Sequence, residues 1–391
     1  MPSTPESLAE AGIHLLPESP KDGITSLCYV KSEEISSSLL ASTSWDGCLR
    51  IHDTSHMNTA DGDSNANGEG PKLVTLQNMD SGPLLSLCTI GNTVYTGGLD
   101  GSIKKFDIET STVTTIGYHP SNMDNDNDSG NGNGASTDMA CSCLNVIPFV
   151  KDGKDDGHIL ASAGWNSQFY LWDVSSSTSE PIYTTSLPDK ALSMDVDPSN
   201  PHRIAISAAG RRLIVIAVQM PDNFDTSKIS ADIVLDRESS LKFQSRVCRF
   251  FPDGIGLAIG SVEGRVAIEF LNELDVSSNG MKKYAFKCHR ADSIVYPVNA
   301  IAFHPIHGTF ATGGCDGSVV TWDGLHKKKL VVLPKFPSSI AAMAFNRDGS
   351  ELAIASSYTF EDGDRGDDAA GKDEIYVKQM LDSEVRPKTG K

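Results

Sequence analysis

The sequence predicts an all-β protein, a closed propeller of seven four-stranded blades. Seven segments each combine small residues, a tight turn and an apolar strand, and alternating apolar runs such as VNAIAFHP precede them. The 391 residues include 34 Gly and 19 Pro, which suits a turn-rich β protein better than a helical one. A closed ring of blades hides the sheet edges that a long open sheet would expose.

The repeat has a fixed internal spacing. The seven segments begin at Ala41, Val94, Leu160, Ile206, Ala258, Phe310 and Leu352. In six of them a turn residue precedes the strand-ending residue by the same interval; these turn residues are Asp46, Asp100, Asn166, Gly210, Glu263 and Asp316. The segments recur roughly every 50 residues, somewhat more than the 40–45 residues of a typical blade. With a further short strand between segments, each unit supplies about four strands.

Ring closure commonly needs one chain end to complete the last blade. The short apolar run Ile13–Leu16 lies upstream of the first full unit, so we expect it to form the outer strand of blade seven. We expect residues 1–391 to form one domain. Polar composition predicts mobile insertions and a flexible tail in this domain; they cover residues 54–71, 119–138, 358–374 and, for the tail, 381–391.

Composition also limits the compartment and the partners. No segment has the roughly 20 apolar residues of a membrane span, and the N-terminus lacks the features of a secretory signal, so we expect a soluble intracellular protein. The eight cysteines include no CxxC pair and suit buried thiols rather than disulfides or a zinc site. A formal charge of −18 disfavours direct binding to nucleic acid or anionic membrane.

Neither a metal site nor a catalytic site is predicted. The pair His304 and His307 has no third ligand at a recognisable spacing, so a structural role is expected. His289 stands where a repeat histidine would bond the turn residue Asp316, and His119 is a candidate for the same role in blade three. The sequence contains none of the common hydrolase or phosphate-loop motifs. We therefore predict no enzyme and no cofactor; acids or histidines lining the channel mouth would favour a propeller enzyme.

The endings LWD, TWD and IHD, at Leu171, Thr321 and Ile51, resemble the WD40 repeats of β-propellers. Longer runs are more specific, among them ESSLKFQSRVCRFFP, SVEGRVAIEFL, KKYAFKCHR, YPVNAIAFHPIHGTFATGGCDG and LAIASSY. Together they resemble the small propeller of the spindle-assembly checkpoint, the third of the budding-uninhibited-by-benzimidazole set. The chain departs from that family in its polar insertions, in Asn166, where most blades use an acid, and in the acidic loop from Tyr358.

That resemblance implies a non-enzymatic adaptor. Members of the family hold a short helical motif of checkpoint kinases and bind phosphorylated Met-Glu-Leu-Thr repeats of a kinetochore scaffold, which delays anaphase. It implies a nuclear protein that moves to kinetochores in mitosis and is a monomer apart from its partners. The alternative is the sister propeller of messenger-RNA export, which binds a similar motif of a nuclear-pore protein.

The blade pattern predicts a basic cluster on one face. Successive strands run antiparallel, so the start of the inner strand and the turn between the second and third strands lie at the same end of a blade. In blade five these positions carry Arg246 and Arg265, and Lys242 lies in the approach. Arg211 and Arg212 occupy the corresponding turn of blade four. Arginine forks match phosphate oxygens, and with the resemblance we expect Arg246, Arg265 and Lys242 to bind a phosphopeptide.

Two alternatives accompany this interpretation. The cations could instead pair with nearby carboxylates such as Glu238, Glu263 or Asp236 and only hold loops together. Trp45 and Trp165 each precede a turn residue on the same face and could pack against a neighbouring blade. Exposed aromatic side chains are favoured interface anchors, so we expect both tryptophans, with Arg211 and Arg212, to seat the partner's helical motif.

Overall fold

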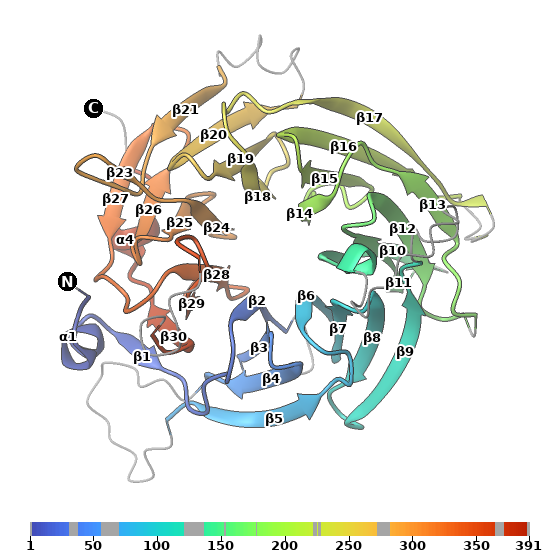
Figure 1. Cartoon of the computed structure of the whole chain (residues 1–391), viewed down its shortest axis with the longest axis horizontal. Helices are drawn as coiled ribbons and strands as arrows, with labels where there is room; N and C mark the ends of the chain where they lie inside the picture. Colours follow the sequence, from blue (N-terminus) through green and yellow to red (C-terminus); the bar gives the residue numbers. More distant parts are fainter. Residues whose placement is uncertain are drawn as a thin grey trace.

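A computed structural model describes residues 2–30, 38–55, 70–120, 137–151, 154–176, 178–221, 225, 228–271, 282–363 and 371–388. Seven four-stranded antiparallel sheets surround a central axis, as Figure 1 shows. The all-β, seven-bladed propeller predicted from the sequence is confirmed. Figure 1 also shows that the chain runs round the ring from the blue N-terminal blade to the red C-terminal one, with the first strand of most blades nearest the axis.

The strands of blades one to four, from inside to outside, are as follows. Blade one contains β2 (Ile24–Tyr29), β3 (Leu39–Ser44), β4 (Cys48–Asp53) and β5 (Lys72–Asn78). Blade two contains β6 (Leu84–Ile90), β7 (Thr93–Gly98), β8 (Ser102–Asp107) and β9 (Thr112–Tyr118). Blade three contains β10 (Cys143–Lys151), β11 (Lys154–Ala163), β12 (Gln168–Asp173) and β13 (Tyr183–Ser186). Blade four contains β14 (Ala191–Val196), β15 (Arg203–Ala208), β16 (Arg212–Gln219) and β17 (Ser230–Glu238).

Blades five to seven complete the ring. Blade five contains β18 (Ser245–Phe250), β19 (Gly256–Ser261), β20 (Arg265–Phe270) and β21 (Tyr284–Lys287). Blade six contains β24 (Val298–Phe303), β25 (Phe310–Gly314), β26 (Val319–Asp323) and β27 (Lys328–Val332). Blade seven contains β28 (Ile340–Phe345), β29 (Glu351–Ser356), β30 (Glu374–Gln379) and β1 (Ile13–Leu15). Short elements are α1 (Pro5–Glu10), η2 (Thr137–Met139), the hairpin β22 (Arg290–Ala291) and β23 (Ile294–Val295), and α4 (Asp382–Val385).

The N-terminal strand closes the ring, as predicted. Strand β1 pairs antiparallel with β30, and Ile13 lies opposite Lys378. Leu8, Ile13 and Leu16 are each only 2% exposed. Leu8 and Ile13 pack into the core between blades six and seven, and Leu16 packs into the core between blades seven and one. The residues before the first full repeat are therefore part of the core.

Buried polar side chains connect blade seven to blade one. The carboxylate of Glu351, which is 5% exposed, accepts hydrogen bonds from the hydroxyls of Tyr29 at 3.1 Å and Thr54 at 2.8 Å. Burial and the neighbouring Glu351 raise the pKa of Tyr29 well above its ordinary value, so this phenol remains a donor.

A histidine network stabilises the turn of blade six. His289 bonds Asp316 through Nδ1 at 2.9 Å and Thr312 through Nε2 at 2.8 Å, and Trp322 donates to the same Thr312 hydroxyl at 2.9 Å. These contacts agree with the structural role predicted for His289. Because the network holds the β25–β26 turn, it also fixes the edge of the face described below.

Blade three contains a related network without the acid. His119 and Trp172 both bond the hydroxyl of Ser162, each at 2.8 Å. At the position of the turn acid, Asn166 donates instead to the hydroxyl of Tyr170 at 2.8 Å. Burial lowers the pKa of His119 to about 3, because charging this imidazole inside the blade is unfavourable.

Stability should therefore decrease as the pH falls. The unfolded chain takes up a proton at His119 near pH 6.5, whereas the folded protein does so only near pH 3. Between these values the unfolded state binds more protons, so His119 removes up to roughly 1.4 kcal/mol of stability per pH unit. We expect the unfolding free energy of a His119→Gln variant, measured with denaturant from pH 7 to pH 4, to depend less steeply on pH than that of the native chain. If His202→Gln flattens the profile as much, the assignment to His119 is wrong.

The predicted insertions begin later than their composition suggested. Thr54 is fully buried and donates to the carbonyl of Ser38 at 2.9 Å, and His119 is 1% exposed. Tyr358, at the start of the third stretch, is 7% exposed. Thr54 and His119 belong to the blades because their polar atoms bond within them, whereas the hydroxyl of Tyr358 donates to the carbonyl of Gly363 in its own loop. Most other residues of the predicted insertions lie outside the described residues; they are residues 56–69, 121–136 and 364–370.

The predicted flexible tail needs a correction. Within residues 381–391, Asp382–Val385 forms helix α4, and Val385 is 3% exposed. Thr309 and Thr321 of blade six donate to the carbonyls of Val385 and Glu384, at 2.6 and 2.9 Å. The polar composition of the tail concealed this contact, because a single apolar side chain and backbone acceptors provide it.

Candidate functional site

Arg246 and Arg265 lie at the same end of blade five. Ser245 of β18 pairs with Ser261 of β19, and Ser261 pairs with Arg265 of β20. The start of the inner strand therefore meets the β19–β20 turn across the sheet. The structure brings the two arginines to one rim, the position that the sequence predicted.

Arg246 occupies a β-bulge at the mouth of the central channel. The register shifts between Ser245 and Val247, and the same shift surrounds Asn299 in blade six. Arg246 and Asn299 therefore occupy equivalent positions in blades five and six. The bulge residue turns its side chain out of the strand ladder, and residues of all seven inner strands line a channel of about 800 Å³ that includes Arg246.

Two other bulge side chains bond the next blade, whereas Arg246 makes no such bond to the described residues. Thr25 donates to the carbonyl of Leu84 at 2.8 Å, and Asn299 donates to that of Ile340 at 3.2 Å. Among the residues that the structure describes, Arg246 forms no hydrogen bond or ion pair. Its half-buried guanidinium can therefore receive an anion without first breaking an ion pair.

Arg265 has one weak local partner. Its Nε lies 3.4 Å from Oε2 of Glu263, and the side chain is 34% exposed. That Nε is buried and makes no hydrogen bond to the described residues. A guanidinium has five N–H donors, so this contact leaves most of them available.

Glu263 also positions Lys242. Its Oε1 accepts a hydrogen bond from the backbone N–H of Lys242 at 2.9 Å, so the β17–β18 connection is fixed beside the Arg265 turn. Lys242 is exposed, and its ammonium group forms no ion pair in the described part of the chain. Phe243 follows it and is 58% exposed. Sequence analysis missed Phe243, although an aromatic residue beside a loop lysine is a usable signal.

Arg211 and Arg212 are paired with acids. Arg211 pairs with Glu238 and donates to the carbonyl of Leu241 at 3.0 Å, while Arg212 Nε donates to Asp236 at 2.9 Å. These are the carboxylate pairings weighed as the alternative in the sequence analysis. The two arginines brace the connection to Lys242 and are less available to a ligand than Arg246.

Trp45 and Trp165 lie on the turns between the second and third strands of blades one and three. This is the end of the blade that carries Arg265 in blade five, so the tryptophans share its face. Trp45 is 43% exposed, and Trp165 is half-buried. The carboxylate of Asp46, the neighbour of Trp45, accepts hydrogen bonds from Arg50 and Ser44. Although burial opposes ionisation, these bonds lower the pKa of Asp46 to about 2.

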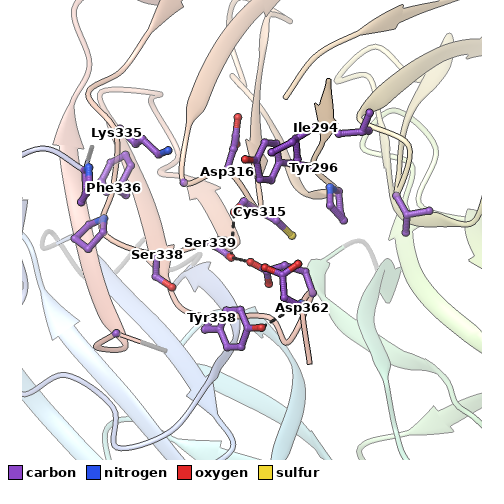
Figure 2. Close-up of a pocket in the computed structure, with 18 residues that line it drawn as sticks. Ile294, Tyr296, Cys315, Asp316, Lys335, Phe336, Ser338, Ser339, Tyr358 and Asp362 are labelled. Carbon is purple, nitrogen blue, oxygen red and sulfur yellow. Dashed lines mark hydrogen bonds between the residues drawn. The ribbon is translucent and has the colours of Figure 1, made fainter. Parts of the chain in front are cut away.

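A groove crosses the same face between blades six and seven. It has a volume of about 480 Å³, and Figure 2 shows Cys315 and Ser339 near its centre, with Ile294 and Tyr296 to one side. No pattern in the sequence predicted this groove. Its walls come from segments far apart in the chain, including Pro2, Val262, Lys335, Tyr358 and Glu361.

No metal site appears among the described residues, since no three His, Cys, Asp or Glu side chains gather there. His304 accepts the N–H groups of Ile306 and His307, and His307 bonds Asp382 of α4 at 3.0 Å. The pair thus has the structural role expected. All eight cysteines are free. No described helix is both long enough and apolar enough to cross a bilayer.

Comparisons with known proteins agree with this architecture. The WD domain, G-beta repeat family model matches residues 13–53 and 280–323. "Mitotic checkpoint protein bub3" of Dictyostelium discoideum is 33% identical over 94% of both chains. "Mitotic checkpoint protein BUB3.1" of Arabidopsis thaliana is 34% identical over 94% of this chain and 93% of its own. "Poly(A)+ RNA export protein" of Schizosaccharomyces pombe is 30% identical over 95% and 92%.

Proposed function

Because the chain belongs to the family of WD-repeat propellers that contains the mitotic checkpoint protein Bub3, we propose that it is a spindle-checkpoint adaptor. It binds a short helical motif of checkpoint kinases and docks them on phosphorylated Met-Glu-Leu-Thr repeats of a kinetochore scaffold, which delays anaphase. It acts in the nucleus and at mitotic kinetochores, as a recognition module without a catalytic step.

One observation carries the proposal: Arg246 is unpaired within the described residues, at the rim that also carries Arg265 and Lys242. A phosphothreonine carries close to two negative charges and three strong acceptors. Charge-assisted hydrogen bonds contribute roughly 1.5–3 kcal/mol each, so two such contacts should favour phosphorylated over plain peptide by about tenfold to a thousandfold. The local basic cluster offsets the repulsion expected from a chain of net charge −18.

The kinase motif occupies another part of the same face. Trp45 and Trp165 are the aromatic anchors, and their separation by one blade suits a segment that crosses the ring. Arg211 and Arg212 support this surface indirectly, since Glu238 and Asp236 already hold them.

A messenger-RNA export adaptor is the second candidate, because export proteins also match over nearly the whole chain. "mRNA export factor GLE2" of Chaetomium thermophilum is 30% identical over 94% of this chain and 90% of its own. An enzyme is disfavoured by the channel lining, which includes no histidine among the described residues and whose two acids bond Arg203 and the N–H of Phe250.

Capture from mitotic extract distinguishes the two candidates. The immobilised chain should retain a checkpoint kinase, and phosphatase treatment should release the kinetochore scaffold but not the kinase. Retention of a nuclear-pore protein alone, unaffected by phosphatase, would favour the export role.

Replacing both tryptophans tests the kinase surface. We expect a Trp45→Ala, Trp165→Ala variant to lose most kinase capture, because each substitution removes a large apolar contact. Its phosphopeptide affinity should be unchanged, since the arginines remain. Trp322→Ala, which removes an internal tryptophan, is the control for general destabilisation. Full kinase capture by the double variant would exclude the two tryptophans as anchors.

A further inference from the structure

The groove between blades six and seven has apolar walls and acidic side chains. The hairpin β22–β23 contributes Ile294, Val295 and Tyr296, and the segment after β29 contributes Tyr358 and Glu361. Ile294 is 58% and Val295 38% exposed, so this wall is open to solvent. Figure 2 shows the segment with Tyr358 and Asp362 across the groove from Ile294 and Tyr296.

Hydrogen bonds to blades six and seven hold the Glu361 carboxylate at the groove. Ser339 donates to Oε1, and Thr359 donates to Oε2 through its backbone N–H at 3.3 Å and its hydroxyl at 2.9 Å. Asn299 of β24 in turn donates to the hydroxyl of Thr359 at 3.1 Å. The carboxylate is therefore positioned by inner-strand and loop contacts even though it lies on a loop.

All of these donors are neutral. In the described part of the chain no lysine or arginine forms an ion pair with Glu361. Asp316, which also lines the groove, is bonded to His289 and Ser318. Lys335 also lines the groove, but in the described part of the chain it forms no ion pair with Glu361. The Glu361 carboxylate is thus a fixed negative charge held by neutral donors.

The groove adjoins the basic cluster. Val262, which belongs to the turn between Ser261 and Arg265, lies in its lining. Burial raises the pKa of Cys315 at the centre of the groove, and the charges of Glu361 and Arg246 act on this thiol in opposite directions. Glu361 lies beside Cys315, because Ser339 donates both to the carbonyl of Cys315 at 3.3 Å and to the Glu361 carboxylate.

We propose that the groove receives a lysine or arginine side chain of the bound peptide, near its phosphothreonine. The aliphatic stem lies against Ile294, Val295 and Tyr296, and the cationic end reaches Glu361. A basic side chain fits because it matches both the apolar wall and the uncompensated carboxylate. This inference rests on the proposed function in one respect, that the ligand is a phosphopeptide.

A lysine scan of the peptide tests the proposal. In a series of peptides, a single lysine is placed at each position in turn on both sides of the phosphothreonine, and the other scanned positions carry glutamine. One position should strengthen binding to the native chain roughly fivefold. The Glu361→Gln variant, which keeps an acceptor for Ser339, should lose this increase in affinity. The control Glu180→Gln, on blade three, changes the net charge equally and should keep it.

The outcomes separate the two proposals. If no lysine position strengthens binding, or if Glu361→Gln retains the gain, the groove proposal is overturned. If the phosphorylated and plain peptides bind equally while the lysine gain persists, the phosphopeptide function fails and the groove remains. Arg246→Ala should weaken every phosphorylated peptide in the scan by a similar factor, because it contacts the phosphate.

Discussion

Removal of residues 1–20 should lower the melting temperature on the order of 10 °C or prevent folding. Leu8, Ile13 and Leu16 are each 2% exposed. Burying three such side chains contributes roughly 5–9 kcal/mol, a large fraction of the stability of a typical domain. The deletion also leaves β30 as an unpaired edge strand, which promotes association. Differential scanning calorimetry with light scattering measures both effects.

Single substitutions in β1 provide the matched control. Ile13 and Leu15 lie in the same strand, but Ile13 is buried while Leu15 is 49% exposed. Ile13→Ala should cost roughly 2–5 kcal/mol, whereas Leu15→Ala should change stability little. Equal effects at the two positions, or an unchanged melting temperature after the deletion, would contradict closure of the ring by β1.

Arg246→Ala should weaken binding of a phosphothreonine peptide at least tenfold and leave folding intact. The guanidinium lies at the channel mouth without a partner among the described residues, so its removal exposes no unsatisfied acid. The affinity of an Arg246→Lys variant should lie between those of the native chain and Arg246→Ala, because an ammonium keeps the charge but loses the bidentate contact with phosphate oxygens. Titration calorimetry and thermal melting on the same samples separate binding from stability.

Arg386→Ala is the control for this substitution. The Arg386 side chain is 70% exposed, and within the described residues its ion pair is with Asp382, next to blade six. The control changes net charge by the same amount but removes no group from the face. If both variants weaken the peptide equally, binding reflects overall charge and the assignment to Arg246 is lost.

The sequence predicted the fold because its repeat spacing is regular. The turn residues Asp316 and Glu263 precede the strand ends Asp323 and Phe270 by the same interval, although only the first segment ends in a WD dipeptide. The shared bulge at Arg246 and Asn299 follows from that regularity. Antiparallel pairing then places the start of the inner strand beside the turn between the second and third strands, so the rim could be deduced without coordinates.

Pairing of individual side chains was harder to predict. The acids near Arg211 and Arg212 were recognisable in the sequence. The β16–β17 register places Arg212 opposite Glu238, yet its side chain bonds Asp236, two residues away on the same strand. The groove could not be predicted at all. Its lining brings together residues as distant as Pro2, Val262 and Glu361, and no local pattern encodes that meeting. The same holds for Val385, whose burial depends on a surface of blade six.

The central claim is that one rim of the propeller carries guanidinium groups ready to receive a phosphate. Titration of the native chain with one threonine peptide, in phosphorylated and plain forms at two salt concentrations, tests it most directly. The phosphorylated form should bind at least tenfold more tightly at low salt, and raising the salt should narrow this difference. Equal affinities for the two forms at low salt would contradict the claim.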